Sequence, residues 1–216
     1  MMNEEPKFFS PFETLQKHGG KLPHWQQPGA TYFVTFRLAD SLPSEQLREW
    51  RTNREDWLEA HPHPWDAETE LEYHKAFSRS IDLWLDQGIG ECLLAREEAA
   101  SVVEDALLHF DPERYLMHSA VVMPNHVHAL VSLGAEGRLE DLVKSWKGFS
   151  ARRINVILNR SGKVWQKNYL DRMIRDAEHF FRVARYVRMN PEKGCVADGA
   201  FRLYETEAIR NMLVDS

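Results

Sequence analysis

Two histidines, two positions apart, are the first residues of the chain whose types and spacing suggest chemistry. His126 and His128 lie within residues 121–133, where two apolar, β-type runs flank the turn dipeptide Pro124-Asn125. Alternate side chains of a strand point the same way, so both imidazoles are expected on one face, roughly 7 Å apart. Such a pair provides half of a divalent-metal site, although it can also be purely structural.

A tyrosine and an asparagine about sixty residues later form a second candidate group. Residues 178–190 predict a helix, and Pro191 disfavours helical geometry at Asn190, which is therefore expected in the last turn with its amide oxygen free to coordinate. Arg182, Tyr186 and Asn190 recur every four residues and share one side of this helix. A phenol there can attack phosphorus while guanidiniums neutralise the phosphate. The alternative is a half-buried tyrosine that only packs.

The charge of the chain is unevenly distributed. The formal net charge is −6, which disfavours nucleic acid as a partner, but residues 144–193 are rich in Lys and Arg while residues 45–72 are rich in acids. Such regional asymmetry is typical of a site for a polyanion, and the alternative is a solvated helical surface. The candidate DNA contacts are Lys144, Lys147, Arg152, Arg153, Arg172, Arg175, Arg182 and Arg185.

The composition indicates a globular protein of one domain with insertions, or of one and a half domains. The chain has 216 residues, of which 43% are hydrophobic and 28% charged, enough for a sizeable core. It contains no apolar run near 18 residues, so no membrane span is expected. Cys92 and Cys195 form no disulfide framework, and residues 1–7 do not resemble a signal peptide, which favours a reducing cytoplasm.

The pattern of elements predicts an α+β fold. Strands are expected at residues 31–38, 115–123 and 126–133, and helices at 96–110, 139–158 and 178–190. Residues 163–169 are expected to form a short strand or an extended piece that continues through 171–175. A helical insertion of about residues 40–90 follows the first strand. Helices covering an antiparallel sheet account for this order. The predicted organisation is an irregular lead-in (1–29), one domain (30–196) and a peripheral C-terminal tail (197–216).

Several motifs, taken in order, resemble those of one family. They are Met123-Pro124-Asn125-His126-Val127-His128, Lys144-Ser145-Trp146-Lys147, Trp165-Gln166, and residues 171–176 and 185–191. With residues 32–37 they resemble the HUH-type tyrosine transposases, and among these the REP-associated tyrosine transposases of bacteria, over roughly residues 22–195. The chain departs from the family in its long insertion and in residues 190–196, where the usual Asn-Pro-Val-Lys-Ala-Gly-Leu is Asn-Pro-Glu-Lys-Gly-Cys-Val.

The resemblance implies a fold and an activity. The fold would be a ferredoxin-like antiparallel sheet with helices. His126, His128 and Asn190 would bind a divalent metal, Mg²⁺ or Mn²⁺, and Tyr186 would be the nucleophile. The activity would be cleavage and rejoining of single-stranded DNA at hairpin or palindromic elements, through a 5′-phosphotyrosine link and a free 3′-hydroxyl. A monomer or homodimer in the bacterial cytoplasm, associated with the nucleoid when bound to DNA, is expected.

Two other functions remain open at this point. A non-catalytic protein that binds single-stranded nucleic acid could use the same sheet and basic helices. A metal-dependent hydrolase of small phosphoesters could use His126 and His128, but it would need further Asp or His ligands, and the sequence offers none at metal-binding spacing.

Overall fold

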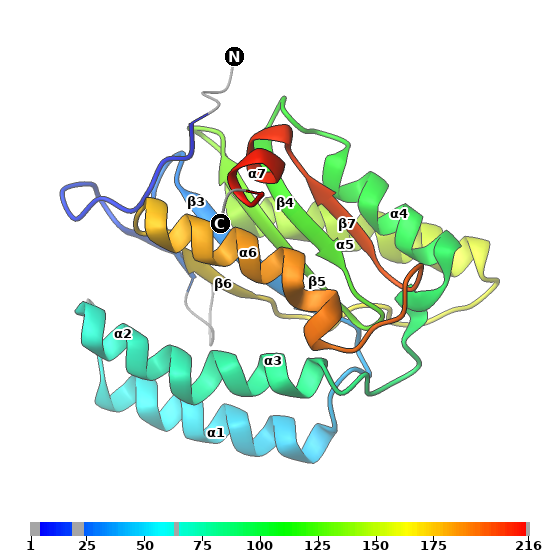
Figure 1. Cartoon of the computed structure of the whole chain (residues 1–216). Coiled ribbons are helices and arrows are strands. Elements are labelled where there is room, and N and C mark those ends of the chain that lie inside the picture. Colours follow the sequence, from blue (N-terminus) through cyan, green and yellow to red (C-terminus); the bar gives the residue numbers. More distant parts are fainter. Residues whose placement is uncertain (1–4, 19–23, 63–64, 215–216) are drawn as a thin grey trace.

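The fold is built around one antiparallel sheet, which the computed structural model shows with its helices in Figure 1. The structure describes residues 5–18, 24–62 and 65–214. Five strands lie in the order β6-β3-β5-β4-β7. They are β3 (Thr31–Arg37), β4 (Tyr115–Val122), β5 (His126–Leu133), β6 (Leu170–Met173) and β7 (Arg202–Glu205). The predicted α+β class is confirmed.

The remaining elements are mostly helices. They are α1 (Ser44–Ala60), α2 (Ala67–Tyr73), the π-helix η1 (His74–Ser78), α3 (Arg79–Leu85), the 3-10 helix η2 (Leu93–Ala95), α4 (Glu97–Leu108), α5 (Leu139–Ile157), α6 (Ala177–Lys193) and α7 (Glu207–Met212). Strands β1 (Gln16–His18) and β2 (His24–Gln26) form a separate pair. None of the helices within the described ranges is long and apolar enough to cross a membrane.

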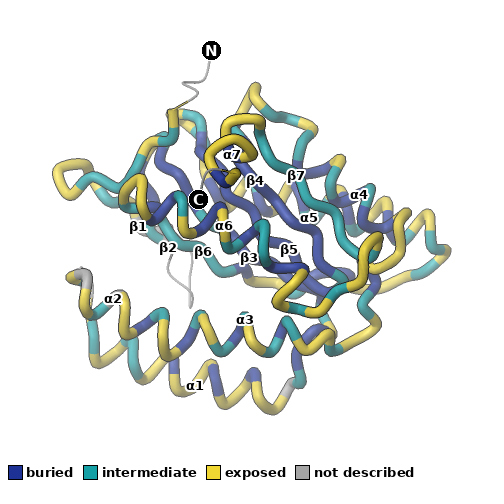
Figure 2. The backbone as a smooth tube through the Cα atoms, viewed as in Figure 1, coloured by how far each residue is buried: buried dark blue, intermediate teal, exposed yellow. Residues whose placement is uncertain are grey.

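The two central strands form the hairpin that the sequence predicts. Every residue of β5 is buried, and all but one of β4, so the centre of the sheet is dark blue in Figure 2. Strand β5 begins at His126, directly after the Pro124-Asn125 turn, and Met123 N donates to His126 O to close that turn. The alternation along β5 therefore follows the prediction, with Val127 and His128 on opposite faces.

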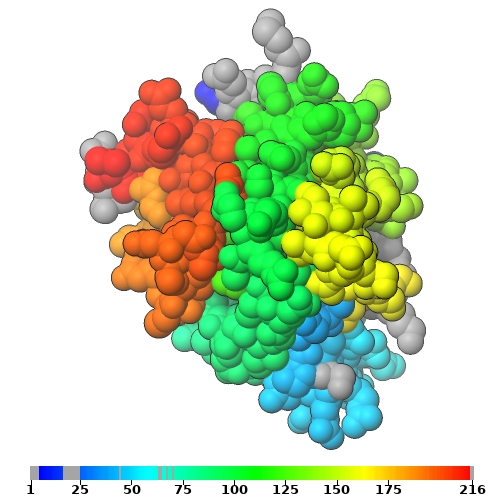
Figure 3. Space-filling model, turned by 90° about the vertical axis from the view of Figure 1, so that its right-hand side faces the viewer, coloured from blue at the N-terminus to red at the C-terminus, as the bar shows by residue number. Residues whose placement is uncertain are grey.

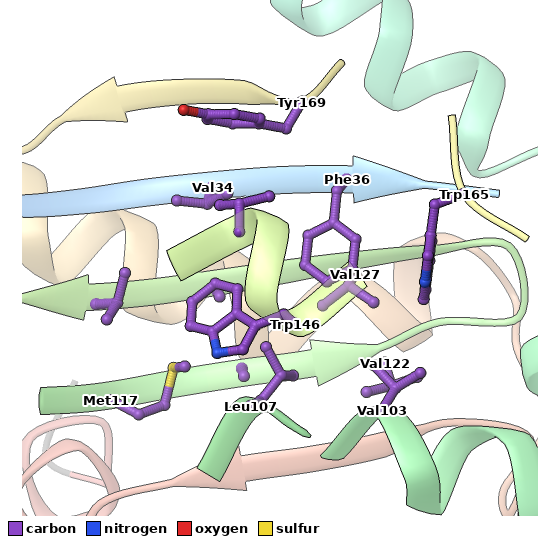
Figure 4. Packing of buried hydrophobic residues seen from close by; sticks show 14 of the residues in the cluster. Val34, Phe36, Val103, Leu107, Met117, Val122, Val127, Trp146, Trp165 and Tyr169 are labelled. Atoms are coloured by element: carbon purple, nitrogen blue, oxygen red, sulfur yellow. The ribbon is translucent and has the colours of Figure 1, made fainter. Parts of the chain in front are cut away.

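Helices α4 and α5 cover one face of the sheet. Figure 4 shows Leu107 of α4 and Trp146 of α5 packed among Val34, Phe36 and Val127 of the strands. The rings of Phe36 and Trp146 stack with centroids 6.3 Å apart. On this face β5 contributes only apolar side chains, and its two histidines lie on the other face.

Helix α6 covers part of the opposite face. Its predicted apolar stripe, Phe180, Val183, Ala184 and Val187, is buried against Val121, Leu130 and neighbouring residues. The stripe fixes how α6 is rotated on the sheet. Residues next to it on the helix are consequently directed along the sheet surface toward β3 and β5.

The insertion between β3 and α4 is helical, as predicted, and has a core of its own. Trp50, Tyr73, Phe77, Ile81 and Leu85 belong to this core, and Leu170 of the sheet packs against it. In Figure 3 the cyan α1 lies at one end of the molecule, below the green, yellow and orange segments of the domain.

The two ends of the insertion are held together. The backbone N–H of Glu91 donates to Asp40 Oδ2 at 2.8 Å. Gly90 has a φ of +99°, and a Cβ there would lie 2.8 Å from the Asp40 carbonyl oxygen, so only glycine fits this close approach. The insertion is thus a helical unit that leaves and re-enters the domain at one place.

Helix α6 is longer than the sequence predicts. It continues through Pro191 to Lys193, so the prediction that it ends at Asn190 is wrong. The missing N–H of Pro191 costs one hydrogen bond near the helix end, where Gly194 N still donates to Asn190 O and Val196 N donates to Pro191 O. Asn190 begins the last turn and is fully buried.

The C-terminal segment is more than a peripheral tail. Strand β7 pairs with β4 and forms an edge of the main sheet, and Ile209 of α7 is buried against the α6 side. The prediction missed this strand because all four of its residues are only half-buried and carry no regular apolar alternation.

The lead-in and residues 163–169 also differ from the prediction. The lead-in contains the β1–β2 pair, and the extended piece at 163–169 is not a strand but makes a single bridge, Trp165 to Leu38. In α5, the buried side includes Val143, Trp146, Ser150 and Ile154, whereas Phe149 and Ile157 are exposed.

The pair Arg188–Glu205 should contribute measurably to stability because it ties α6 to β7. Arg188 Nε and Nη2 donate to the two carboxylate oxygens of Glu205, each at 2.9 Å, and the Glu205 side chain is only 7% exposed. Glu205→Ala leaves the guanidinium unpaired and is expected to cost about 2 kcal/mol, or roughly 4–8 °C in Tm. Thermal unfolding followed by circular dichroism measures this.

Glu178→Ala is the matched control. It removes the partner of Arg182 on the same helix, but both of those side chains are exposed, at 82% and 59%. The expected loss is below about 0.5 kcal/mol. Equal effects of the two substitutions would show that β7 is not anchored through Glu205.

Candidate active site

Three potential metal-binding atoms converge between β5 and α6. His126 Nε2 lies 3.1 Å from His128 Nε2 and 3.3 Å from Asn190 Oδ1. The three residues are 1%, 0% and 0% exposed. The structure thus brings together the two histidines and the asparagine that the sequence singled out, from segments some sixty residues apart.

Asn125 fixes the orientation and the proton of His126. Its Nδ2 donates to the carbonyl oxygens of Leu85 and Ile89, at 3.1 and 3.3 Å, so its Oδ1 must be the atom that faces His126 Nδ1 at 2.7 Å. An amide oxygen only accepts, hence Nδ1 of His126 carries the proton. The Nε2 of the neutral ring then presents a lone pair to the converging atoms.

His128 is held from the neighbouring strand. Thr35 lies directly opposite it in the β3–β5 register, and its Oγ1 is 2.7 Å from His128 Nδ1. Phe33, also on β3, stacks on the imidazole with ring centroids 5.2 Å apart. Both histidine rings therefore have one nitrogen occupied by a partner and the other directed at the convergence point.

Burial keeps both imidazoles neutral. It lowers the pKa of His126 to about 4, with the Asn190 contact opposing the shift. Burial lowers the pKa of His128 well below its usual value, and the neighbouring His126 and Lys193 lower it further. Neutral imidazole is the form that binds a metal ion.

The contacts at this point fit a cation. The Nε2 lone pair of His126 faces the carbonyl oxygen of Asn190, so two acceptors point at one another, while the buried Nδ2 of Asn190 has no partner among the described residues. A cation between the acceptors would satisfy them. The described ranges contain no cluster of three or more His, Cys, Asp or Glu suited to a metal, and the third protein donor to such a cation would be the amide of Asn190.

Tyr186 lies beside this convergence point. Its ring centroid is 5.3 Å from that of His128 and 5.7 Å from that of Phe33. The ammonium of Lys193, at the end of α6, lies 4.5 Å from the centroid of the tyrosine ring. The predicted tyrosine is thus in ring contact with one of the two predicted histidines, His128.

The phenol oxygen of Tyr186 is surrounded by charged groups of other elements. It is buried and has no well-formed hydrogen bond within the described part of the chain. Burial raises its pKa above the usual value, and Asp82 and Asp86 of α3 raise it further. Burial also raises the pKa of Asp82 to about 6, against the opposing effect of Arg172.

Arg172 is the one predicted DNA contact that reaches the tyrosine. It lies on β6, opposite Phe33 in the register, and interacts with both Asp82 and Tyr186. Its Nε is buried without a hydrogen-bond partner in the described ranges. A guanidinium with a free donor beside a phenol is suited to binding a phosphate oxygen.

The other predicted DNA contacts do not form one surface. Lys144, Arg152 and Arg153 are exposed on α5, whereas Arg182 and Arg185 are exposed on α6, across the sheet from them. Lys147 donates to backbone carbonyl oxygens of residues 166–168. The expectation of a single basic face is wrong, because α5 and α6 are neighbours in sequence but pack on opposite faces of the sheet.

Sequence reasoning missed four residues of the site. Thr35 could have been found from the strand register, and Lys193 from its position seven residues after Tyr186 on a continued helix. Asn125 was interpreted only as a turn residue. Asp82 comes from the insertion, and no pattern in the sequence places that insertion over the sheet.

One known family resembles part of the chain. Residues 97–190 match the family model described as "Transposase IS200 like". The predicted resemblance to the tyrosine transposases is confirmed for this segment. His126, His128, Tyr186 and Asn190 all lie within it.

Two solved structures are also similar. One is a REP-associated tyrosine transposase bound to a REP hairpin, at 13% identity over 81% of this chain and 74% of that chain, with a TM-score of 0.45. The other is a candidate transposase from Deinococcus radiodurans R1, at 16% identity over 74% of this chain and 89% of that chain, with a TM-score of 0.37. None of the curated proteins matches the chain.

The role of Asn125 can be tested without any metal. Wild-type His126 is expected to be the Nδ1–H tautomer, and Asn125→Ala, which removes the acceptor, should shift it toward Nε2–H. The loss should also cost about 1–3 kcal/mol, since two buried carbonyl oxygens lose their donor. Long-range ¹H–¹⁵N spectra of the imidazoles report the tautomer directly. Thr35→Val, which affects His128 alone, is the control, and a wild-type Nε2–H tautomer would contradict the assignment.

Proposed function

We propose that this chain is a metal-dependent, transposase-like enzyme that cuts and rejoins single-stranded DNA at hairpin or palindromic elements. Tyr186 is the nucleophile, and the intermediate is a 5′-phosphotyrosine with a free 3′-hydroxyl. The observation that carries the proposal is the convergence of His126, His128 and Asn190, with the ring of His128 in contact with the ring of Tyr186. The IS200-like transposase match over residues 97–190 supports it, because it contains all four.

The two imidazoles and the amide would hold the divalent ion, Mg²⁺ or Mn²⁺. Imidazole ligands favour Mn²⁺, whereas Mg²⁺ prefers oxygen. When bound, such an ion supplies Lewis-acid polarisation of the scissile phosphate. Asn125 and Thr35 keep the His126 and His128 rings oriented toward it.

The protein groups around Tyr186 account for the proton balance of the reaction. The phenol oxygen forms a bond to phosphorus while the bond from phosphorus to the 3′ oxygen breaks. Asp82 accepts the phenol proton and passes it to the departing 3′ oxygen, and a pKa of about 6 suits both directions near neutrality. Arg172 binds the phosphate oxygens. Reversal of the same steps rejoins the strand without ATP.

Entry of a DNA strand requires the insertion to move. The metal-binding residues and the phenol oxygen are buried, and Asp82 of α3 lies against the phenol. A phosphate cannot reach Tyr186 in this arrangement. Outward movement of α3 admits the strand without disrupting the sheet, because the insertion has its own apolar core, and the return of α3 places Asp82 against Tyr186 and the bound phosphate.

A second function, non-catalytic binding of single-stranded nucleic acid, has one observation in its favour. The phenol oxygen of Tyr186 is closed off from solvent, as expected of a tyrosine that only packs. The two functions differ in whether a covalent protein–DNA product forms.

Tyr186→Phe is expected to abolish that product while binding persists. Wild-type protein incubated with a hairpin-bearing single strand and Mn²⁺ should give an adduct stable to denaturing electrophoresis, and the variant should reduce its rate by at least about three orders of magnitude. Tyr204→Phe, at a half-buried tyrosine of β7, is the control and should retain the activity. An adduct of equal yield with the Tyr186 variant would remove this residue from the mechanism.

Removal of the metal should also abolish the covalent protein–DNA product, and this loss should be reversible. EDTA is expected to stop adduct formation by the wild type, and added Mn²⁺ or Mg²⁺ to restore it. His128→Ala should be inactive at any tested metal concentration, since it removes one of the two imidazoles. Full activity in EDTA would exclude the assigned role of the His126, His128 and Asn190 group.

A further inference from the structure

A pocket between the insertion and the edge of the sheet adjoins the candidate active site. Thr35 and Arg37 of β3 line one side of it, and Trp50 and Arg51 of α1 line the other. Thr35 also contacts His128 Nδ1, and Arg37 is directly opposite His126 in the strand register. The pocket therefore lies immediately next to the residues that converge on the metal position.

The pocket contains positive charge without a matching acid. Arg37 is 8% exposed, and its donors reach the carbonyl oxygen of Leu38 and the hydroxyl of Ser41, not a carboxylate. Arg51 is exposed and forms no ion pair in the described part of the chain. A buried guanidinium is normally paired, so two arginines facing one small pocket indicate a place for an anion.

A third cation lies behind the same pocket. Lys147 Nζ donates to the carbonyl oxygens of Gln166, at 2.6 Å, and Lys167, at 2.8 Å, and Gln166 itself lines the pocket. Arg37 and Lys147 repel one another: burial and Arg37 lower the pKa of Lys147 to about 8, and burial and Arg51 lower that of Arg37 to about 10. Both remain protonated at neutral pH, and an anion would relieve the repulsion.

We propose that this pocket is a subsite for a backbone phosphate of the single strand, adjoining the phosphate that Tyr186 attacks, with Arg37 and Arg51 as its anion-binding residues. The proposal rests on the proposed function for the identity of the strand. Guanidiniums bind phosphate oxygens through two parallel hydrogen bonds, and the amide side chains of Gln166 and Asn168 provide further polar contacts. Because Arg51 belongs to the insertion, a bound strand would contact the insertion as well as the sheet.

Arg51→Gln tests the subsite, since an exposed residue can be changed without unfolding the domain. Binding of a fluorescein-labelled single-stranded oligonucleotide, measured by anisotropy across salt concentrations, should weaken roughly tenfold. The slope of log Kd against log salt should fall by about 0.7, the value for one phosphate contact on a single strand. Arg48→Gln, on the same helix but outside the pocket and with an 81% exposed side chain, should change neither quantity.

Oligonucleotides with a single methylphosphonate linkage locate the phosphate. One linkage should weaken binding of the wild type and of Arg48→Gln more than binding of Arg51→Gln, because that variant has only the Arg37 contact left to lose. Equal effects of the two substitutions, or no linkage whose cost depends on Arg51, would overturn the proposal. A pocket that binds free phosphate and not the DNA backbone would also contradict the proposal. In that case inorganic phosphate, at equal ionic strength, would displace DNA from the wild type more than from Arg51→Gln, and no single linkage would show a cost that depends on Arg51.

The adduct assay separates this proposal from the proposed function. If the wild type forms the covalent product and the methylphosphonate coupling is absent, the phosphate subsite is contradicted and the proposed enzymatic function is supported. If the coupling is present but no adduct forms with any metal, the phosphate subsite is supported in a protein that binds DNA without cutting it.

Discussion

Strand β5 must bury both of its faces, and it fills only one of them entirely with apolar side chains. Toward α4 and α5 it presents Val127, Ala129 and Val131, and toward α6 it presents His126 and His128. Imidazoles taken out of water have to remain neutral and to find hydrogen-bond partners. Asn125 satisfies one nitrogen of His126 and Thr35 one nitrogen of His128, and the remaining nitrogens have only each other and Asn190. The Nε2 atoms of the two histidines and the amide oxygen of Asn190 are therefore the atoms that could bind a metal ion.

The insertion is connected to the site through the same hydrogen bonds. Asn125 accepts from His126 and donates to the carbonyl oxygens of Leu85 and Ile89 at the end of the insertion. Opening the site would break these two bonds and the contact of Asp82 with Tyr186, a cost of a few kcal/mol that a bound strand can offset. The position of the insertion and the orientation of His126 are therefore coupled through one side chain.

Local patterns predicted the parts of the site that depend on one element. The His-x-His alternation is correct because β5 is a regular strand, and the spacing of Tyr186 and Asn190 is correct because α6 is a regular helix. The predictions failed where packing between distant segments determines whether a segment is a strand, where a helix ends or which face of the sheet it covers. Nothing in the sequence of β7 distinguishes an edge strand from a tail, and the helix continues past Pro191 because following residues close its end. The lysines and arginines of α5 and α6 were grouped by sequence, although the sheet separates them.

The charge balance of the site links metal and DNA. Both imidazoles and the Asn190 amide are neutral, so a divalent ion would enter a buried place without a carboxylate among the three protein donors, near the ammonium of Lys193 and the guanidinium of Arg172. Buried charge that is not compensated is unfavourable, and the phosphate of a bound strand is the group best able to compensate it. Metal and strand should consequently favour one another's binding by the same factor, since coupling between two ligands is reciprocal.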